Sequence, residues 1–155
     1  MSNITINLNN SERFSTTLDV INLIEVLKSQ VDNEETELVI SNEDIQGDDL
    51  SLILESLTIY LREDSKTTTL PQPMPNDKSF EEIVQQEWEK DIVEAINLRE
   101  GDERIKYALK MGTICDYLCC TMLKNFFCAY IGSWMRRSDN KVVESFFREA
   151  GMLVE

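Results

Sequence analysis

The chain contains no histidine, and its 15 Lys and Arg residues are outnumbered by 29 Asp and Glu residues. Without histidine, a cysteine nucleophile has no imidazole base, and a mixed Cys/His zinc site cannot form. The net charge of −14 disfavours nucleic acid and anionic membrane surfaces as ligands, because both are bound through clustered Lys and Arg. These absences favour a protein-binding module over an enzyme.

Long apolar runs are also missing. None approaches the roughly 20 residues that a membrane-spanning helix needs, and the first residues, MSNITINLNNSERF, lack the basic and apolar regions of a secretory signal. We therefore expect a protein of the cytoplasm and nucleus, where thiols stay reduced. The thiols are then free or metal-bound, and they are Cys115, Cys119, Cys120 and Cys128.

Proline is scarce and confined to one segment. All three Pro residues lie in SKTTTLPQPMPNDK, residues 65–78, which predicts an extended and exposed loop because Pro excludes a regular helix. The 155 residues are 42% apolar, which suits one average domain with a single core.

Before this loop the pattern mixes strands and helices. Residues 4–8 alternate apolar and polar as a half-buried strand does, and residues 13–17 can return as the second strand of a hairpin. From Leu18 the apolar positions fit one face of a helix. A short apolar run at 38–40 predicts a buried strand, and residues 50–62 predict a second helix.

After the loop the pattern is helical throughout. Ser79 can cap a helix with Glu82 three residues on, and this helix is predicted to run through Trp88 and Ile92. Asp139 is a predicted cap for the last helix. Around the break at 100–102, further helices are predicted at about 103–111, 113–131 and 139–150.

The spacing of two cysteines suggests a metal site, but the full set of four does not support one. Cys115 and Cys119 stand one helical turn apart and could share an ion, but Cys128 would point away from Cys119 on a continuous helix. Zinc sites usually place Cys pairs on turns. We therefore interpret the thiols as core side chains of apolar helices. A thiol- or zinc-dependent enzyme is the remote alternative.

Residues 42–47, NEDIQG, resemble the front of a calcium-binding loop. The twelfth position of such a loop would be Ile53 instead of the required bidentate Glu, so we interpret the segment as a turn. Phosphate-binding, dinucleotide-binding, hydrolase-elbow and metalloprotease motifs do not occur in the sequence. No catalytic residue, cofactor or metal is therefore expected.

Charge is distributed unevenly. Residues 32–55 hold nine acidic residues and no basic one, whereas residues 121–148 hold five basic and two acidic residues. A solvated acidic face explains the first segment. The second leaves open a docking site for an acidic partner.

The C-terminal third carries more apolar surface than one small core needs. If one helix continues far enough, one of its faces holds Leu123, Phe127, Tyr130 and Trp134, with Phe126 beside them. Phe146 and Phe147 are adjacent and cannot both face the same core. Core packing explains most of this stripe, and we interpret the surplus as a partner interface, because such interfaces are anchored by aromatic and Met side chains.

The order of these elements resembles the S-phase kinase-associated adaptor family, the F-box-binding subunits of SCF ubiquitin ligases, and their relative elongin C. Those proteins share a BTB/POZ fold. The segments that carry the resemblance are ITINLNNSERF, LVISNEDIQGDDLSLILESLTIYLRE, EWEKDI, DERIKYALKMGTICDYLCCT and SDNKVVESFF. The chain stops at Glu155, before the family's final acidic helix, which implies a shortened grip on an F-box.

The resemblance implies an α+β fold with a BTB/POZ-like domain, a small sheet flanked by helices, over residues 1–112. A helical partner-binding extension would follow over residues 113–155. The chain would bridge a cullin scaffold to an F-box-type helical receptor, without chemistry of its own. The alternative is a BTB-like module that self-associates as a homodimer, or binds another helical partner, without a cullin.

The resemblance also implies two sets of contact residues. The positions that match the family's cullin side are Ile59, Tyr60, Ala108 and Met111. The positions that match its receptor side are Leu123, Phe126, Phe127, Val142, Val143 and Phe146. For each of them, burial in the core of the chain is the alternative.

Overall fold

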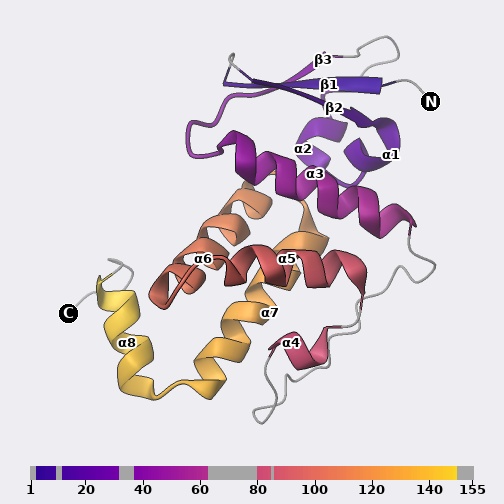
Figure 1. The fold of residues 1–155 in the computed structure, drawn as a ribbon. Coiled ribbons are helices and arrows are strands. Elements are labelled where there is room, and N and C mark those ends of the chain that lie inside the picture. The colour runs from indigo at the N-terminus through magenta and orange to yellow at the C-terminus, as the bar shows by residue number, and fades with distance from the viewer. Residues whose placement is uncertain (1–2, 10–11, 32–36, 63–79, 85, 150–155) are drawn as a thin grey trace.

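The computed structural model of the chain describes residues 3–9, 12–31, 37–62, 80–84 and 86–149. This part of the chain has an α+β fold, with a three-stranded sheet and its helices at one end and a group of helices at the other (Figure 1). Within these residues, no helix has the length and apolar character needed to cross a membrane.

The sheet has the strand order β2-β1-β3. β1 (Asn3–Leu8) pairs antiparallel with β2 (Glu12–Thr17), which confirms the predicted hairpin. β1 also pairs parallel with β3 (Glu37–Ile40), which confirms the strand predicted at 38–40, although β3 is half-buried because Val39 is exposed. Alternate residues of β1 face the core, as the period of two requires. Those buried residues are Ile4, Ile6 and Leu8.

Two short helices replace the single helix predicted after the hairpin. α1 (Leu18–Ile21) and α2 (Glu25–Lys28) are separated at Ile24, whose backbone is extended (φ −117°, ψ 97°). The break lets the Val26 N–H donate to the carbonyl of Leu118, 3.2 Å away, at the end of a helix in the other half. Carbonyls at a helix C-terminus have no partner within the helix, so this long-range hydrogen bond explains the break.

α3 (Gly47–Arg62) lies between the sheet and the helical half in Figure 1. It begins three residues before the predicted start at Leu50, because Asp49 accepts a hydrogen bond from the Gln46 N–H and supports an earlier first turn. The acidic segment 32–35 and the Pro-containing segment 65–78 lie outside the described residues.

The helix predicted to run from Ser79 through Ile92 is interrupted. α4 (Phe80–Ile83) and α5 (Glu87–Asn97) are separated around Gln86, whose backbone is extended (φ −80°, ψ 147°). The buried Gln86 side chain accepts a hydrogen bond from the indole N–H of the buried Trp88. The interruption therefore places a polar partner beside the buried indole N–H, as buried Trp residues usually have. The predicted Ser79 cap lies outside the described residues.

The helical half consists of α5 with α6 (Asp102–Tyr117), α7 (Thr121–Arg137) and α8 (Asn140–Glu149). The expected gap between helices at Gly112 is wrong, because α6 continues through this residue. The chain turns instead at Cys119, which has a φ of 56°. The position proposed as a boundary between two domains therefore lies inside α6, and buried apolar side chains form one cluster that spans both halves.

Gly112 serves packing between α6 and α7. A Cβ atom at this position would lie 3.6 Å from the Cβ of Phe127 on α7, which is an ordinary van der Waals contact. A methyl group would therefore fit, whereas a longer side chain would crowd Phe127. Gly132 on α7 differs, because a Cβ there would meet no atom within 4 Å. The two glycines therefore form a matched pair, one packed and one open.

We expect Gly112→Leu to lower the free energy of unfolding by about 1–3 kcal/mol, because the added side chain overpacks the α6–α7 contact. Gly132→Leu is expected to raise it by about 0.5–1 kcal/mol, since leucine favours the helix more than glycine does. Urea unfolding followed by circular dichroism measures both. Equal effects of the two substitutions would contradict the assigned role of Gly112.

Candidate protein-interaction surface

The helical half is organised around the ring of Phe126 on α7. This buried ring lies 5.3 Å from Phe80 of α4, 5.4 Å from Trp88 of α5 and 6.0 Å from Phe127, measured between ring centroids. Edge-on and tilted aromatic pairs of this kind add stability beyond the area that they bury. Phe126 therefore fixes the position of α7 against two other helices.

The predicted apolar stripe on α7 is confirmed, because the helix continues to Arg137. Three of the four predicted side chains on this face are buried, namely Leu123, Phe127 and Tyr130. Trp134, one turn before the end of α7, is only partly buried. The stripe thus serves as core along most of α7 and reaches the surface near the end of the helix.

Trp134 holds α8 in place. Its ring lies 5.2 Å from Phe146 and 6.4 Å from Phe147, and the two Phe rings lie 5.4 Å apart. Phe146 is buried and Phe147 is partly buried. Both neighbouring Phe side chains therefore pack against one Trp, which is how adjacent residues of a helix share a single apolar contact.

α8 begins at its predicted cap, because the Asp139 carboxylate accepts a hydrogen bond from the Lys141 N–H at 2.8 Å. The helix is strongly amphipathic, and Val142 on it is 52% exposed. Val143 is partly exposed. We call Val142, Val143, Phe146 and Phe147 the α8 apolar face. Phe146 closes its inner edge against Trp134, and the two Val residues leave its outer edge open to a partner.

The predicted receptor-side residues thus separate into two groups. Leu123, Phe126, Phe127 and Phe146 are at most 4% exposed, so in this conformation they support the surface and do not form it. Val142 and Val143 remain accessible and lie next to each other on α8. Of the predicted receptor-side positions, Val142 and Val143 are therefore the ones that are accessible in this conformation.

The predicted cullin-side residues separate in the same way. Ala108 and Met111 on α6 have no exposed area, whereas Ile59 and Tyr60 on α3 are partly exposed. The Tyr60 ring packs edge-on against Trp88, 5.8 Å away. Ile59 also lines a groove of about 350 Å³ between β2 and α3. A partner on this side can reach α3 without a rearrangement of α6.

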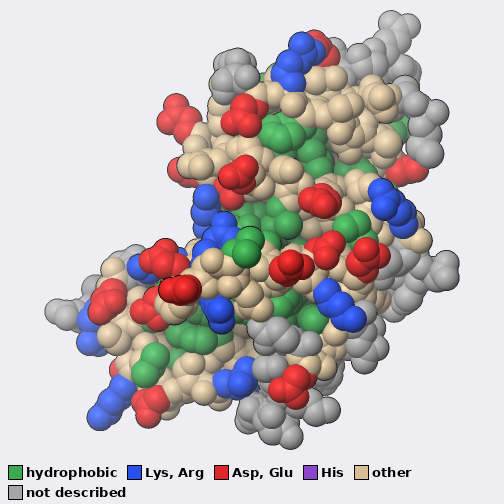
Figure 2. All heavy atoms as spheres, viewed as in Figure 1, with side chains coloured by type: hydrophobic (Ala, Val, Ile, Leu, Met, Phe, Trp, Pro, Cys, Tyr) green, Lys and Arg blue, Asp and Glu red, His purple; other side chains and the backbone are tan. Residues whose placement is uncertain are grey.

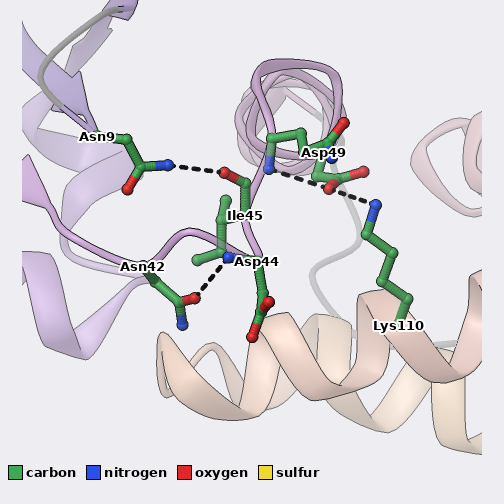
Figure 3. A network of polar contacts seen from close by, with 7 residues as sticks. Asn9, Asn42, Asp44, Ile45, Asp49 and Lys110 are labelled. Carbon is green, nitrogen blue, oxygen red and sulfur yellow. Dashed lines mark hydrogen bonds and ion pairs between the residues drawn. The ribbon is translucent and has the colours of Figure 1, made fainter.

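A polar network ties the start of α3 to α6 (Figure 3). The Asp49 carboxylate lies 3.0 Å from the Lys110 ammonium of α6 and accepts a hydrogen bond from the Gln46 N–H at 3.2 Å. The side chain of Asp49 is only 5% exposed. One buried carboxylate therefore caps α3 and holds the helix that carries Ala108 and Met111.

The same network shows the conformation of the segment that resembles a calcium loop. The Asp44 N–H donates to the Asn42 side-chain oxygen at 2.9 Å, and the Asn9 side-chain amide donates to the Ile45 carbonyl at 3.1 Å. The first bond is an Asx-turn, so the predicted turn is confirmed. Among the described residues, no group of three or more Cys, Asp or Glu side chains could hold a metal ion.

The basic residues of the C-terminal third have a local role as well. Arg136 and Arg137 lie in the last turn of α7, and Arg148 lies in the last turn of α8. Positive charge at a helix C-terminus is favoured by the helix dipole. Figure 2 shows that Asp and Glu side chains are spread widely over one face of the molecule, with apolar surface between them.

The cysteines form two pairs by environment. Cys115 and Cys120 are buried, and burial raises the pKa of the Cys120 thiol to about 11 and raises the pKa of Cys115 as well. Cys119 and Cys128 are exposed. The prediction of core thiols is therefore confirmed for two residues and wrong for the other two, because Cys119 lies in the turn between α6 and α7 and Cys128 lies on an exposed side of α7.

No protein family model matches the chain, and no curated protein has a matching sequence.

We expect Asp49→Ala to lower the free energy of unfolding by about 1–3 kcal/mol, because it removes the α3 cap and leaves Lys110 without its partner. Asp48→Ala, at the exposed neighbouring position in the same first turn, is the matched control and should cost less than about 1 kcal/mol. Urea unfolding measures the difference. Equal losses of stability would mean that Asp49 stabilises the chain through the helix dipole alone and not through the polar network.

At about pH 8, where an ordinary thiol is partly ionised, we expect two thiols of the folded chain to react quickly with dithionitrobenzoate. All four should react in urea. Because a raised pKa keeps Cys115 and Cys120 protonated and burial shields them, the fast pair should be Cys119 and Cys128. The Cys119→Ser/Cys128→Ser variant should lose the fast phase. A fast phase that survives in this variant would show that the buried pair is accessible.

Proposed function

We propose that the chain is a non-enzymatic adaptor of the BTB/POZ type, a divergent relative of the F-box-binding subunits of SCF ubiquitin ligases. In this role it bridges a cullin scaffold and a helical receptor protein. The observation that carries the proposal is the order of elements in the described residues, which is compatible with the order expected from the resemblance.

The topology of the α/β half supports this proposal. The β1–β2 hairpin is followed by short helices, by β3 placed beside β1, and by α3. The helical half then opens with the segment that contains Trp88, as the resemblance expects. The added turns around Ile24 and Gln86 interrupt helices without changing this order.

The separation of the two candidate contacts supports a bridging role. Ile59 and Tyr60 lie on α3 beside the sheet, whereas Val142 and Val143 lie on α8 at the far end of the helical half (Figure 1). A cullin on α3 and a receptor helix on α8 would therefore not compete for the same surface. Because one core joins the two halves, the adaptor would hold both partners in a fixed relative orientation.

The experiment that tests the proposal is gentle affinity purification of the tagged chain from its native cells, followed by mass spectrometry. Recovery of a cullin together with F-box proteins would support the adaptor role. Recovery of only further copies of the chain, or of helical partners without a cullin, would replace it with the BTB-like module that acts without a cullin. Absence of every such protein would sink the proposal.

We expect Val142→Asp to weaken capture of the receptor by at least about tenfold, because it places a charge in the centre of an apolar contact. Asn140→Asp adds the same charge at an exposed position outside the α8 apolar face and should leave capture unchanged. Pull-down of purified receptor by each variant gives the comparison. Equal capture by the Val142 variant and the unaltered chain would place the receptor elsewhere.

A further inference from the structure

A pocket of about 390 Å³ lies between α4, the start of α6 and the last turns of α7. Its volume falls within the range of roughly 300–1,000 Å³ that small ligands occupy. Neither set of predicted contact residues lines it. Its lining residues carry aromatic rings, guanidinium groups and hydroxyl groups. Each of these groups limits the chemical class of ligand that the pocket can bind.

The aromatic wall is rigid. Phe80 and Tyr130 line the pocket and pack edge-on with their ring centroids 5.2 Å apart. Phe80 also packs against Phe126 in the core. Trp134 adds a third ring and is itself packed against α8. Phe80 and Tyr130 are only 3% and 8% exposed, so the partly buried Trp134 is the ring that a ligand can reach most easily. Its ring favours a flat, apolar portion of a ligand, because aromatic groups pack well on one another.

The first cation, Arg104, is positioned by the backbone. Its Nε donates to the Arg99 carbonyl at 2.7 Å, and its Nη2 is 3.4 Å from the Asn97 carbonyl. Both acceptors are uncharged, so they orient the guanidinium without neutralising it. A guanidinium carries five N–H donors, and these two bonds leave the others for a ligand.

The turn that presents these carbonyls is itself fixed. Gly101 precedes α6 with a φ of 57°, a conformation that favours glycine. The Arg99 guanidinium lies 3.4 Å from the centre of the Tyr107 ring and donates to the Ala95 carbonyl at 2.6 Å. The orientation of Arg104 therefore does not depend on a bound ligand, and preorganisation of this kind lowers the cost of binding.

The second cation, Arg137, lies at the end of α7 and also lines the pocket. Within the described residues it forms no ion pair with a carboxylate. Ser133, which is 2% exposed, and Ser138 bring hydroxyl groups to the same pocket. No Asp or Glu is among the described residues that line it, although acidic residues outnumber basic ones by 29 to 15 in the chain.

We propose that this pocket binds an aryl phosphate monoester, and that its natural ligand is a phosphotyrosine side chain of a partner protein. A phosphate monoester carries a charge of about −1.5 to −2 at neutral pH and three strong acceptor oxygens. Two guanidinium groups and two hydroxyl groups match that charge and number of acceptors better than they match the two oxygens of a carboxylate. The aromatic wall accounts for the aryl group.

The proposal does not rest on the adaptor role, because every group that it uses belongs to this chain and lies outside the α3 and α8 contacts. Failure of cullin binding would leave the pocket proposal intact. Failure of phosphate binding would likewise leave the adaptor proposal intact.

The test is a titration of the isotope-labelled full chain with N-acetylphosphotyrosinamide, followed by NMR. We expect shifts at the Trp134 indole N–H and at the backbone amides of Ser133 and Ser138. Arg137→Gln should weaken binding by at least about tenfold, because it removes charge-assisted hydrogen bonds. Lys141→Gln, which removes one exposed positive charge on α8, should change affinity less than about twofold, because Lys141 is not among the residues that line the pocket and its charge is screened by salt.

Two comparison ligands make the result decisive. N-acetyltyrosinamide lacks the phosphate and inorganic phosphate lacks the ring, so each should bind at least about tenfold more weakly than the phosphotyrosine compound. Equal binding of either comparison ligand, or equal weakening by Arg137→Gln and Lys141→Gln, would overturn the proposal. Because Arg137 is exposed at a helix end, its spectrum outside the pocket should match that of the unaltered chain, and Arg137→Lys should restore part of the affinity.

Discussion

α7 packs against α6 where Gly112 faces Phe127, and a Cβ atom at Gly112 would already be in van der Waals contact with the Cβ of Phe127, 3.6 Å away. The neighbouring residue, Phe126, then reaches Phe80 and Trp88 and seats α4 and α5. Two adjacent rings on one helix thus face two different sides of the helical half. The end of α7 carries Trp134 to the place where α8 packs, so the position of the last helix also follows from the contact at Gly112.

The two halves of the chain are joined by polar links as well as by the shared core. The Asp49–Lys110 ion pair connects α3 to α6, and the hydrogen bond from Val26 to the Leu118 carbonyl connects α2 to the end of α6. Both links end on α6. This helix therefore acts as a common support for both halves, and residue 112 lies within it.

Local pattern was sufficient for the strands, for α3 and α8 and for the Asp139 cap, because each depends on neighbours in the sequence. Local pattern failed where contact with a residue distant in the sequence determines the structure. The break at Ile24 depends on the hydrogen bond to Leu118. Gly112 predicts a helix end from sequence alone, but in the structure it lies within α6 and faces Phe127. The candidate site follows the same rule: amphipathic pattern located α8, but only packing separates the exposed Val142 from the buried Phe146. The pocket gave no sequence signal, because Arg104 and its aromatic neighbours come from separate helices.

Trp134 belongs to two surfaces at once, since it lines the Arg104–Arg137 pocket and holds the α8 apolar face through Phe146 and Phe147. A ligand that shifts this ring would change the support of α8, and a partner that clamps α8 would change the pocket. Any such coupling is reciprocal by thermodynamic necessity, so each site would alter the affinity of the other by the same factor. If the pocket and the α8 apolar face bind the ligands proposed for them, this one indole ring would be the physical link between the two sites.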